Sequence, residues 1–140
     1  MTSAPPEAPV APGSGAHDLV GYDVDLSAGD GTARVVLDLA PKHLNRNGSL
    51  HGGIIAMMLD ASAGFAASLA GGPDLVPVVT VALNTQYLAP AISGRVTATG
   101  HVKQAGRSIC YADADLRDAA GKLLATGNGV FKYMRKEGGT

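Results

Sequence analysis

Residues 45–70 read N-R-N-G-S-L-H-G-G-I-I-A-M-M-L-D-A-S-A-G-F-A-A-S-L-A, and the rest of the fold follows from this segment. After the glycine pair at 52–53, apolar and small residues continue for several helical turns, and the Gly-Gly-Pro sequence at 71–73 ends the run. The large apolar side chains are spread around the helical circumference, so we expect a helix that is covered by protein on almost every side. They are Ile54, Ile55, Met57, Met58, Leu59, Phe65 and Leu69. The only ionisable side chain in the helix is Asp60, and a carboxylate in such surroundings needs a function or a partner.

The whole chain is short and nearly neutral. Its 140 residues carry a net charge of −1, which suits one domain around one central element and argues against a nucleic-acid partner. We expect a flexible leader over residues 1–15, one domain over 16–136 and a flexible tail over 137–140. The single cysteine, Cys110, cannot form an internal disulfide, and the N-terminus lacks the blocks of a signal peptide, so we expect a cytoplasmic protein. Asp60 in the middle of the apolar run, without basic flanks, argues against a membrane span.

Six short runs with strand character flank the helix. The runs 19–26 and 32–40 precede it and are separated by a glycine-rich turn typical of a hairpin. The runs 75–88, 95–103, 107–116 and 122–133 follow it, and their short separators predict an antiparallel meander.

Side-chain alternation in these runs indicates where the helix lies. One face of the run 95–103 carries Val96, Ala98, Gly100 and Val102, whereas the other face is polar. The last run places Ala125, Gly127 and Gly129 on one face, and residues this small allow a helix to lie close to a sheet. The sequence therefore predicts an α+β protein in which a curved antiparallel sheet of about six strands wraps one long buried helix.

This order of elements, together with several motifs, resembles the hotdog-fold acyl-CoA thioesterases over residues 19–134. The motifs are N-R-N-G-S-L-H-G-G at 45–53, the acid Asp60, T-V-A-L-N-T-Q-Y-L-A-P-A at 80–91, G-R at 106–107 and G-K-L-L-A-T-G at 121–127. With Asp as its helix acid, the chain resembles the PaaI and thioesterase superfamily member 2 (THEM2) types of this family. The menaquinone-pathway and enterobactin-proofreading relatives carry Glu at that position. The resemblance implies hydrolysis of an acyl-CoA thioester to a free acid and coenzyme A.

Thioester hydrolysis requires a polarised carbonyl, an attacking oxygen and an acceptor for its proton. The start of the helix offers free backbone N–H groups and the positive end of the helix dipole, and the resemblance implies that the Gly52 amide is the oxyanion donor. Gly53 next to it leaves room for a substrate carbonyl, although two glycines could simply permit a tight turn. Asp60 is the candidate nucleophile or general base, and the sequence does not choose between these roles. Its alternative is a carboxylate satisfied by a local hydroxyl or by a partner across an interface.

The spacing of these two groups predicts a shared site. Asp60 follows Gly52 by eight residues, which is about 12 Å along a helix and too far for both to reach one thioester carbon. A two-fold dimer can place the helix start of one subunit opposite Asp60 of the other. We therefore expect at least a homodimer, and similarity suggests a homotetramer.

Three further candidates come from the related enzymes. There, residues at the positions of Asn45 and His51 hold and polarise the thioester or its departing sulfur, and a Ser or Thr at the position of Thr80 orients water beside the acid. A His near the positive end of a helix is expected to be neutral. The alternatives are that Asn45 caps a turn, that His51 fills a packing position and that Thr80 is an ordinary strand residue.

The resemblance also places the coenzyme A tail and the acyl group. The expected substrate-binding residues are Gly53, Met57, Leu88, Ala89, Pro90, Lys103, Gly106, Arg107 and Ser108. Lys103 and Arg107 could meet phosphates, although exposed basic residues near a turn are usually only solvated. The pocket-lining candidates Met57, Met58, Phe65 and Tyr87 do not choose between aryl-acetyl groups, suggested by PaaI-type relatives, and medium or long chains, suggested by THEM2-type relatives. The histidines show no metal-ligand spacing, so we expect neither a metal nor a cofactor.

Two other functions remain open at this point. A hydratase or dehydratase acting on an acyl thioester would need a His and an acid at the substrate's alpha and beta carbons, roles for which His51 and Asp60 could be mistaken. A non-catalytic acyl-CoA-binding protein is the second alternative.

Overall fold

The computed structural model describes residues 14–135. The expected leader at 1–15 and tail at 137–140 therefore fall outside the described residues, except for Ser14 and Gly15. The elements in chain order are α1 (Gly15–Val20), β1 (Asp23–Asp25), β2 (Ala33–Asp38), the 3-10 turn η1 (Pro41–His43), α2 (Gly52–Gly71), β3 (Val78–Tyr87), β4 (Arg95–Ala105), β5 (Ile109–Asp118) and β6 (Leu123–Tyr133).

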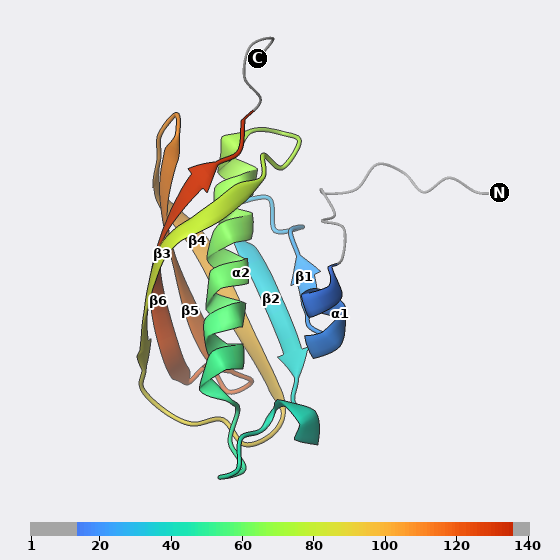
Figure 1. Cartoon of the computed structure of the whole chain (residues 1–140). Coiled ribbons are helices and arrows are strands. Elements are labelled where there is room, and N and C mark those ends of the chain that lie inside the picture. The colour runs from blue at the N-terminus through green and yellow to red at the C-terminus, as the bar shows by residue number, and fades with distance from the viewer. Residues whose placement is uncertain (1–13, 136–140) are drawn as a thin grey trace, which may run out of the picture.

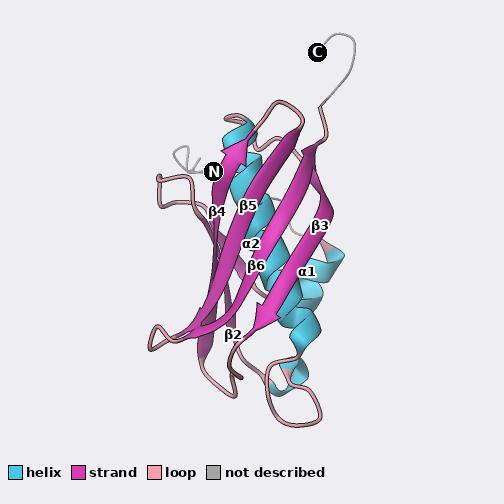
Figure 2. Ribbon diagram, turned by 90° about the vertical axis from the view of Figure 1, so that its left-hand side faces the viewer, coloured by secondary structure: helices cyan, strands magenta, loops and turns pink. Residues whose placement is uncertain are grey.

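One sheet and one long helix make up the domain. The six strands are antiparallel and lie in the order β1-β2-β4-β5-β6-β3. The sheet curves around α2, which lies across one of its faces, while no helix of residues 14–135 covers the other face (Figures 1 and 2). This arrangement confirms the expected hotdog fold of the α+β class.

The position of β3 corrects one expectation. β3 does not pair with the next strand in sequence but lies at the edge beside β6, whereas β4 pairs with β2 and β5. The connection between β3 and β4 instead passes the start of α2, because the N–H of Leu50 donates to the carbonyl of Ala91 at 2.8 Å and that of Leu39 to Gly94 at 2.9 Å. The meander is therefore limited to β4, β5 and β6.

The first strand is also shorter than expected. Leu19 and Val20 belong to α1, and only Asp23–Asp25 forms a strand. The side chain of Ser14 caps this helix by accepting the His17 N–H at 3.1 Å, and Gly21 ends it with φ at 84°. A cap and a left-handed glycine thus favour a helical turn where the apolar run suggested a strand.

Small residues let α2 lie close to the sheet, as the alternation predicted. A Cβ added at Gly100 of β4 would overlap the backbone carbonyl of Ser62, and one at Gly127 of β6 would lie 3.3 Å from Leu59 Cβ. The buried residues of the helix are Ile55, Met58, Leu59, Ser62, Ala63, Ala66, Ala67 and Ser68. Within one chain α2 is therefore covered on its sheet side, whereas residues such as Asp60 and Gly64 are only half-buried.

The edge strand β3 is the least covered element of the sheet. Val79 and Val81 are 45% and 58% exposed, and Tyr87 at its end is 51% exposed. A long edge strand with exposed apolar side chains is a surface that proteins normally cover. Among the described helices, α2 alone is long and apolar enough to cross a membrane, but its packing against the sheet is that of a core helix.

Candidate active site

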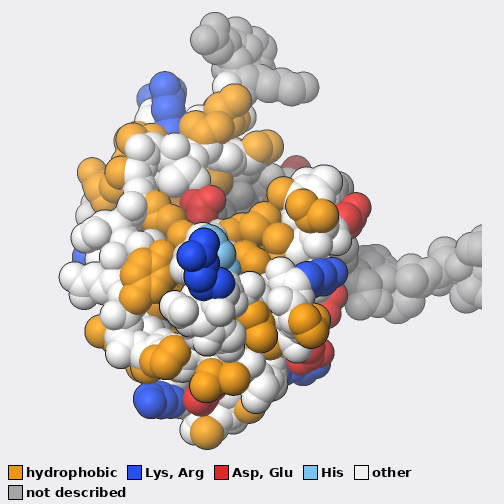
Figure 3. All heavy atoms as spheres, turned by 60° about the horizontal axis from the view of Figure 1, so that its bottom comes forward, with side chains coloured by type: hydrophobic (Ala, Val, Ile, Leu, Met, Phe, Trp, Pro, Cys, Tyr) orange, Lys and Arg blue, Asp and Glu red, His pale blue; other side chains and the backbone are white. Residues whose placement is uncertain are grey.

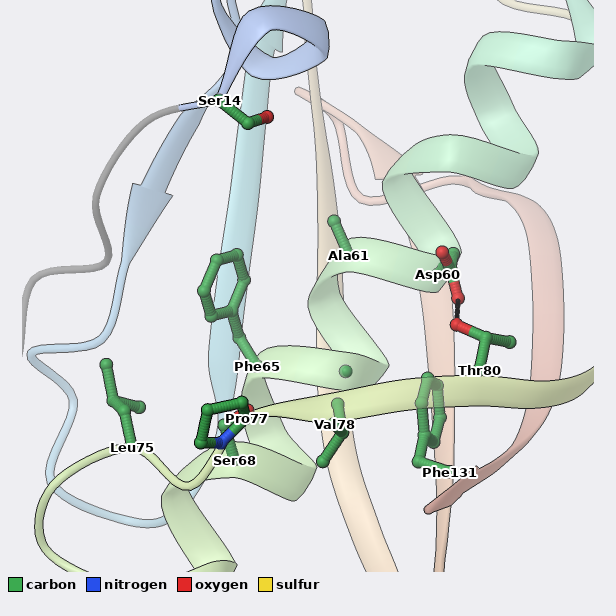
Figure 4. A pocket seen from close by; sticks show the side chains of 11 residues that line it. Ser14, Asp60, Ala61, Phe65, Ser68, Leu75, Pro77, Val78, Thr80 and Phe131 are labelled. Atoms are coloured by element: carbon green, nitrogen blue, oxygen red, sulfur yellow. Dashed lines mark hydrogen bonds between the residues drawn. The ribbon is translucent and has the colours of Figure 1, made fainter. Parts of the chain in front are cut away.

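Asp60 lies in the middle of α2, where it meets the edge strand β3. Its Oδ1 accepts a hydrogen bond of 2.7 Å from the hydroxyl of Thr80, and the two side chains point toward each other in Figure 4. Asp60 is half-buried and Thr80 is exposed. A charge-assisted bond of this kind stabilises the carboxylate and fixes its rotamer, so a second oxygen is left to act on a bound molecule.

A cleft of about 640 Å³ opens beside this pair. It runs between the half-buried face of α2, the loop before β3, and β3 itself (Figure 4). The residues that line it are Ser14, Asp60, Ala61, Gly64, Phe65, Ser68, Leu75, Pro77, Val78, Thr80 and Phe131. The volume and the mainly apolar lining with a few polar groups are those of a small-molecule site.

Tyr22 is a buried neighbour of the acid. The phenol is 7% exposed, and its ring stacks on His17 with 4.5 Å between centroids. Burial, and then the negative charge of Asp60, raise the pKa of Tyr22. Tyr22 therefore stays protonated at neutral pH and adds no second charge near the carboxylate.

The start of α2 forms a second polar centre. His51 is the N-cap, and its Nδ1 accepts the N–H of Gly53 at 2.8 Å. Because Nδ1 accepts a hydrogen bond, the ring is held as the neutral tautomer with its proton on Nε2. Gly52 is the first residue of the helix, so its N–H has no acceptor within the helix. His51 is exposed and thus caps the helix instead of filling a packing position.

Tyr87, at the end of β3, contacts the start of α2. Its hydroxyl donates to the carbonyl of Gly52 at 3.0 Å. A Cβ added at Gly52 would lie 3.7 Å from the Tyr87 ring, an ordinary contact. The end of β3 is therefore tied to the first residue of α2.

The loop before α2 is organised by Asn45. Its Oδ1 accepts the N–H groups of Asn47 at 2.9 Å and of Ser49 at 3.2 Å, which is the turn-capping role that the sequence left open. Within residues 14–135 its Nδ2 has no acceptor and can still donate to a ligand. The buried His43 anchors the same loop, since its Nδ1 accepts the Ala40 N–H at 3.0 Å and its Nε2 donates to the Val20 carbonyl at 2.7 Å.

The expected substrate-binding residues lie at two ends of the molecule. Leu88 and Ala89 hydrogen-bond to the carbonyl of Leu124 and, with Pro90, follow Tyr87 at the end where α2 begins. Figure 3 looks onto this end, where a basic group lies over a histidine and hydrophobic side chains lie nearby. Gly53 is exposed here, and Met57 is half-buried against the core one turn further along.

The turn with Gly106, Arg107 and Ser108 lies at the other end of α2. Arg135 connects the two, because its guanidinium donates to the carbonyl of Arg107 at 3.1 Å and to that of Gly71 at 3.4 Å. Lys103 on the adjoining strand lies 3.9 Å from Asp113. A single chain therefore does not bring this turn to the Gly52 amide.

Asp60 and the start of α2 are also separated within one chain. Asp60 and Thr80 meet at the middle of the helix, whereas Asn45, His51 and Gly52 lie at its N-terminus. Gly52 precedes Asp60 by eight residues, which is about 12 Å along the helix. His51 and Asp60 are therefore not adjacent, which is unfavourable for a His–Asp hydratase pair in one subunit.

Most residues that line the cleft are not among those predicted from the sequence. Gly64 and Ser68 belong to a helical stripe with Ala61 and Phe65, at i, i+3, i+4 and i+7 from Ala61. This periodicity next to Asp60 could have identified the helix side of the cleft. The contributions of Leu75 and Phe131 could not have been found, because they depend on the loop path and the strand order. Among the described residues, no group of three His, Cys, Asp or Glu side chains is placed to hold a metal ion.

Comparison with known proteins identifies the family. The sequence matches the thioesterase superfamily over residues 47–125. Human acyl-coenzyme A thioesterase 13 is 33% identical over 104 residues, which cover 73% of this chain and 73% of that protein. The structure of zebra fish thioesterase superfamily member 2 has a TM-score of 0.71 at 32% identity and covers 81% of both chains. PaaI, from the phenylacetic acid degradation operon of E. coli, has a TM-score of 0.77 at 24% identity, covering 87% of this chain and 86% of that one, and shows the shared fold. The resemblance inferred from the motifs is thus confirmed, and this chain is a thioester hydrolase that belongs to the thioesterase superfamily.

Proposed function

We propose that this protein is an acyl-CoA thioesterase that hydrolyses an aryl-acetyl-CoA or a medium- or long-chain acyl-CoA to the free acid and coenzyme A. The observation that carries the proposal is the Asp60 carboxylate, held by the Thr80 hydroxyl at 2.7 Å at the edge of an open apolar cleft. In a chain of this family, that arrangement suits a thioester carbon placed over Asp60 with its acyl group in the cleft.

Asp60 acts as the nucleophile or the general base. As a base it takes a proton from water while the water oxygen attacks the thioester carbon; the carbon–sulfur bond then breaks, and the thiolate of coenzyme A leaves and is protonated. As a nucleophile its free oxygen attacks the thioester carbon, the carbon–sulfur bond breaks, and the thiolate of coenzyme A leaves and is protonated by water. Water then hydrolyses the resulting mixed anhydride to the free acid and the Asp60 carboxylate. In both cases Thr80 keeps Oδ1 occupied, so that Oδ2 faces the substrate.

The developing oxyanion is bound by the Gly52 amide of a second subunit. The separation of about 12 Å between Gly52 and Asp60 along one helix supports a shared site. The exposed apolar edge of β3 supports pairing of two copies through this strand. The Nε2–H of His51 and the Nδ2 of Asn45 then lie next to the thioester, where they polarise it or meet the departing sulfur. The protein works as at least a homodimer, with a homotetramer as the expected assembly.

Coenzyme A supplies no catalytic group in this scheme, and the reaction uses neither a metal nor a cofactor. The pantetheine arm of coenzyme A passes Gly53, Met57 and the segment 88–90 at the start of α2. Lys103 and the turn at 106–108 reach the phosphates only from the other subunit, because within one chain they lie at the opposite end of the helix. The protein acts in the cytoplasm under this proposal.

Thiol release from a panel of acyl-CoA esters tests the proposal. The native chain should hydrolyse at least one ester, and Asp60→Asn should lose activity by about a thousandfold or more while remaining folded. Asp18→Asn, which changes an exposed acid outside the cleft, should behave like the native chain. Unchanged hydrolysis by Asp60→Asn would refute the assignment.

The same panel separates the alternatives. A hydratase or dehydratase would convert an enoyl- or hydroxyacyl-CoA without releasing thiol. A binding protein would retain acyl-CoA without turnover.

A further inference from the structure

The cleft beside Asp60 has an inner wall with a regular pattern. Ala61, Gly64, Phe65 and Ser68 are spaced as one face of α2 and all line the cleft. Figure 4 shows this face between Asp60 with Thr80 at one end and Leu75 with Pro77 toward the other. The cleft therefore forms an open channel that extends from Asp60 along this face of the helix.

The length of this channel selects among acyl groups. From Asp60 to Ser68 the helix advances eight residues, about 12 Å. Carbon–carbon bonds of about 1.5 Å in a zigzag chain advance about 1.25 Å each, so roughly eight to ten carbons span that distance. A cavity of about 150 Å³ is enough for a benzene ring, and the cleft of about 640 Å³ is several times larger.

The lining of the cleft also disfavours an acyl group that carries a charge. Apart from Asp60 at its start, the lining residues carry no ionisable side chain. A terminal carboxylate on the acyl group would lose solvation without meeting a cation, and would share the cleft with Asp60. The channel therefore suits a neutral, apolar chain.

Gly64 is a position at which a single substitution would narrow the cleft. A Cβ added there would lie 3.4 Å from Phe131 Cε1 and 3.9 Å from Val78 Cγ2, and both neighbours line the cleft. Alanine thus fits at this position without overlap, but it covers the gap between the two side chains. Leu75 lines the cleft at the far end from Asp60, and it holds a left-handed backbone with φ at 54°, a conformation that costs a non-glycine residue about 1 kcal/mol.

We propose that the cleft from Asp60 to Leu75 is the acyl site for a neutral chain of roughly eight to ten carbons, with Gly64 and Leu75 setting the chain length. This proposal rests on the proposed acyl-CoA thioesterase function. Gly64 and Leu75 are specificity-determining residues that act on the tail of the substrate and not on the thioester.

Values of kcat/KM over a series of saturated acyl-CoA esters test it. The native chain should be most active on octanoyl- or decanoyl-CoA and should prefer hexanoyl-CoA to adipyl-CoA, which ends in a carboxylate, by at least about tenfold. Gly64→Ala should lower the decanoyl-to-butyryl ratio of kcat/KM by about tenfold. Leu75→Gly, which suits the left-handed backbone, should shift the preference toward dodecanoyl-CoA.

Ala70→Val is the matched control, because it enlarges an exposed residue of the same helix outside the cleft and should leave the profile unchanged. An equal loss on all chain lengths in Gly64→Ala, a best substrate of phenylacetyl-CoA, or equal turnover of adipyl- and hexanoyl-CoA would each overturn the acyl-site proposal. These outcomes leave the thioesterase intact, whereas the absence of Asp60-dependent thiol release refutes the proposed function itself.

Discussion

At the residue scale, the site depends on one hydrogen bond between two elements. Thr80 Oγ1 donates to Asp60 Oδ1 at 2.7 Å, and the carboxylate is half-buried at the edge of an apolar cleft. Without the hydroxyl, this acid would lose both its orientation and a donor to its charged form. Thr80 is therefore a positioning residue for Asp60 in the proposed mechanism.

Replacing this hydroxyl gives a residue-scale prediction. Thr80→Val should lower kcat by roughly ten- to a hundredfold, since a hydrogen bond to a charged group contributes about 1.5–3 kcal/mol. Thr80→Ser, which keeps the hydroxyl, should recover most of the activity, and KM should change little in either variant. Steady-state kinetics on one acyl-CoA ester measure both constants. If Thr80→Val and Thr80→Ser lose the same activity, Thr80 only packs in its strand.

At the element scale, α2 can lie close to the sheet because β4 and β6 carry glycines where the helix crosses them. The carbonyl of Ser62 occupies the space where a Cβ at Gly100 would lie. The same close packing directs the opposite face of the helix, with Asp60 and Gly64, toward the cleft. The position of the acid is thus a consequence of glycines in β4 and β6.

Gly100→Ala should consequently destabilise the fold strongly. The added methyl overlaps backbone that cannot move without shifting α2, and we expect a loss of about 3 kcal/mol in the free energy of unfolding. Urea denaturation followed by circular dichroism measures it. The neighbouring Thr99→Ala removes a half-buried side chain on the other face of the strand and should cost less than about 1 kcal/mol. Equal stability of Gly100→Ala and the native chain would contradict this packing.

At the scale of the whole molecule, the proposed site needs two copies of the chain. Gly52→Pro isolates the oxyanion donor, because proline lacks the N–H yet suits the first position of a helix. His51 already has φ at −61° and ψ at 133°, the extended conformation that a residue before proline requires. The backbone therefore accepts this change, and the variant should fold but have almost no activity.

Mixing two inactive variants tests the shared site. Asp60→Asn and Gly52→Pro chains, unfolded together and refolded at equal amounts, should form mixed dimers in which one of the two sites has both groups intact. About a quarter of the native activity should return if dimers assemble at random. Each variant refolded alone is the control. A mixture that stays inactive although mixed dimers are present places Gly52 and Asp60 in the same subunit.

The buried phenols give the fold a pH dependence in alkaline solution. Burial raises the pKa of both Tyr22 and Tyr133 above 10.0, and the Tyr133 hydroxyl donates to the Ala67 carbonyl at 2.8 Å. The folded chain therefore keeps protons that the unfolded chain loses near pH 10, so the stabilisation is complete below that pH and is lost above it. The urea midpoint should fall steadily from about pH 9 to about pH 11. Tyr133→Phe should be less stable at neutral pH but should show a smaller decrease, and an equal decrease would contradict the assignment.

Local sequence signals are sufficient to specify the central helix, its two ends and the acid in its middle. A long apolar run, a glycine pair before it and Gly-Gly-Pro after it act within a few residues of one another. The small-residue strand faces on which the helix packs are specified in the same way. Gly52, His51 and Asp60 combine such local signals with the family motifs, and the sequence is therefore enough to name them as candidate site residues.

The remaining features depend on tertiary contacts. The apolar residues 19–20 form a helix because a Ser cap precedes them and a left-handed glycine follows them. β3 reaches the edge of the sheet because the connection between β3 and β4 is held at the start of α2. The Thr80–Asp60 bond and the cleft that Gly64, Leu75 and Phe131 form follow from that strand order. Contacts between residues distant in sequence depend on how the chain closes on itself, and that information is not contained in the pattern of any single segment.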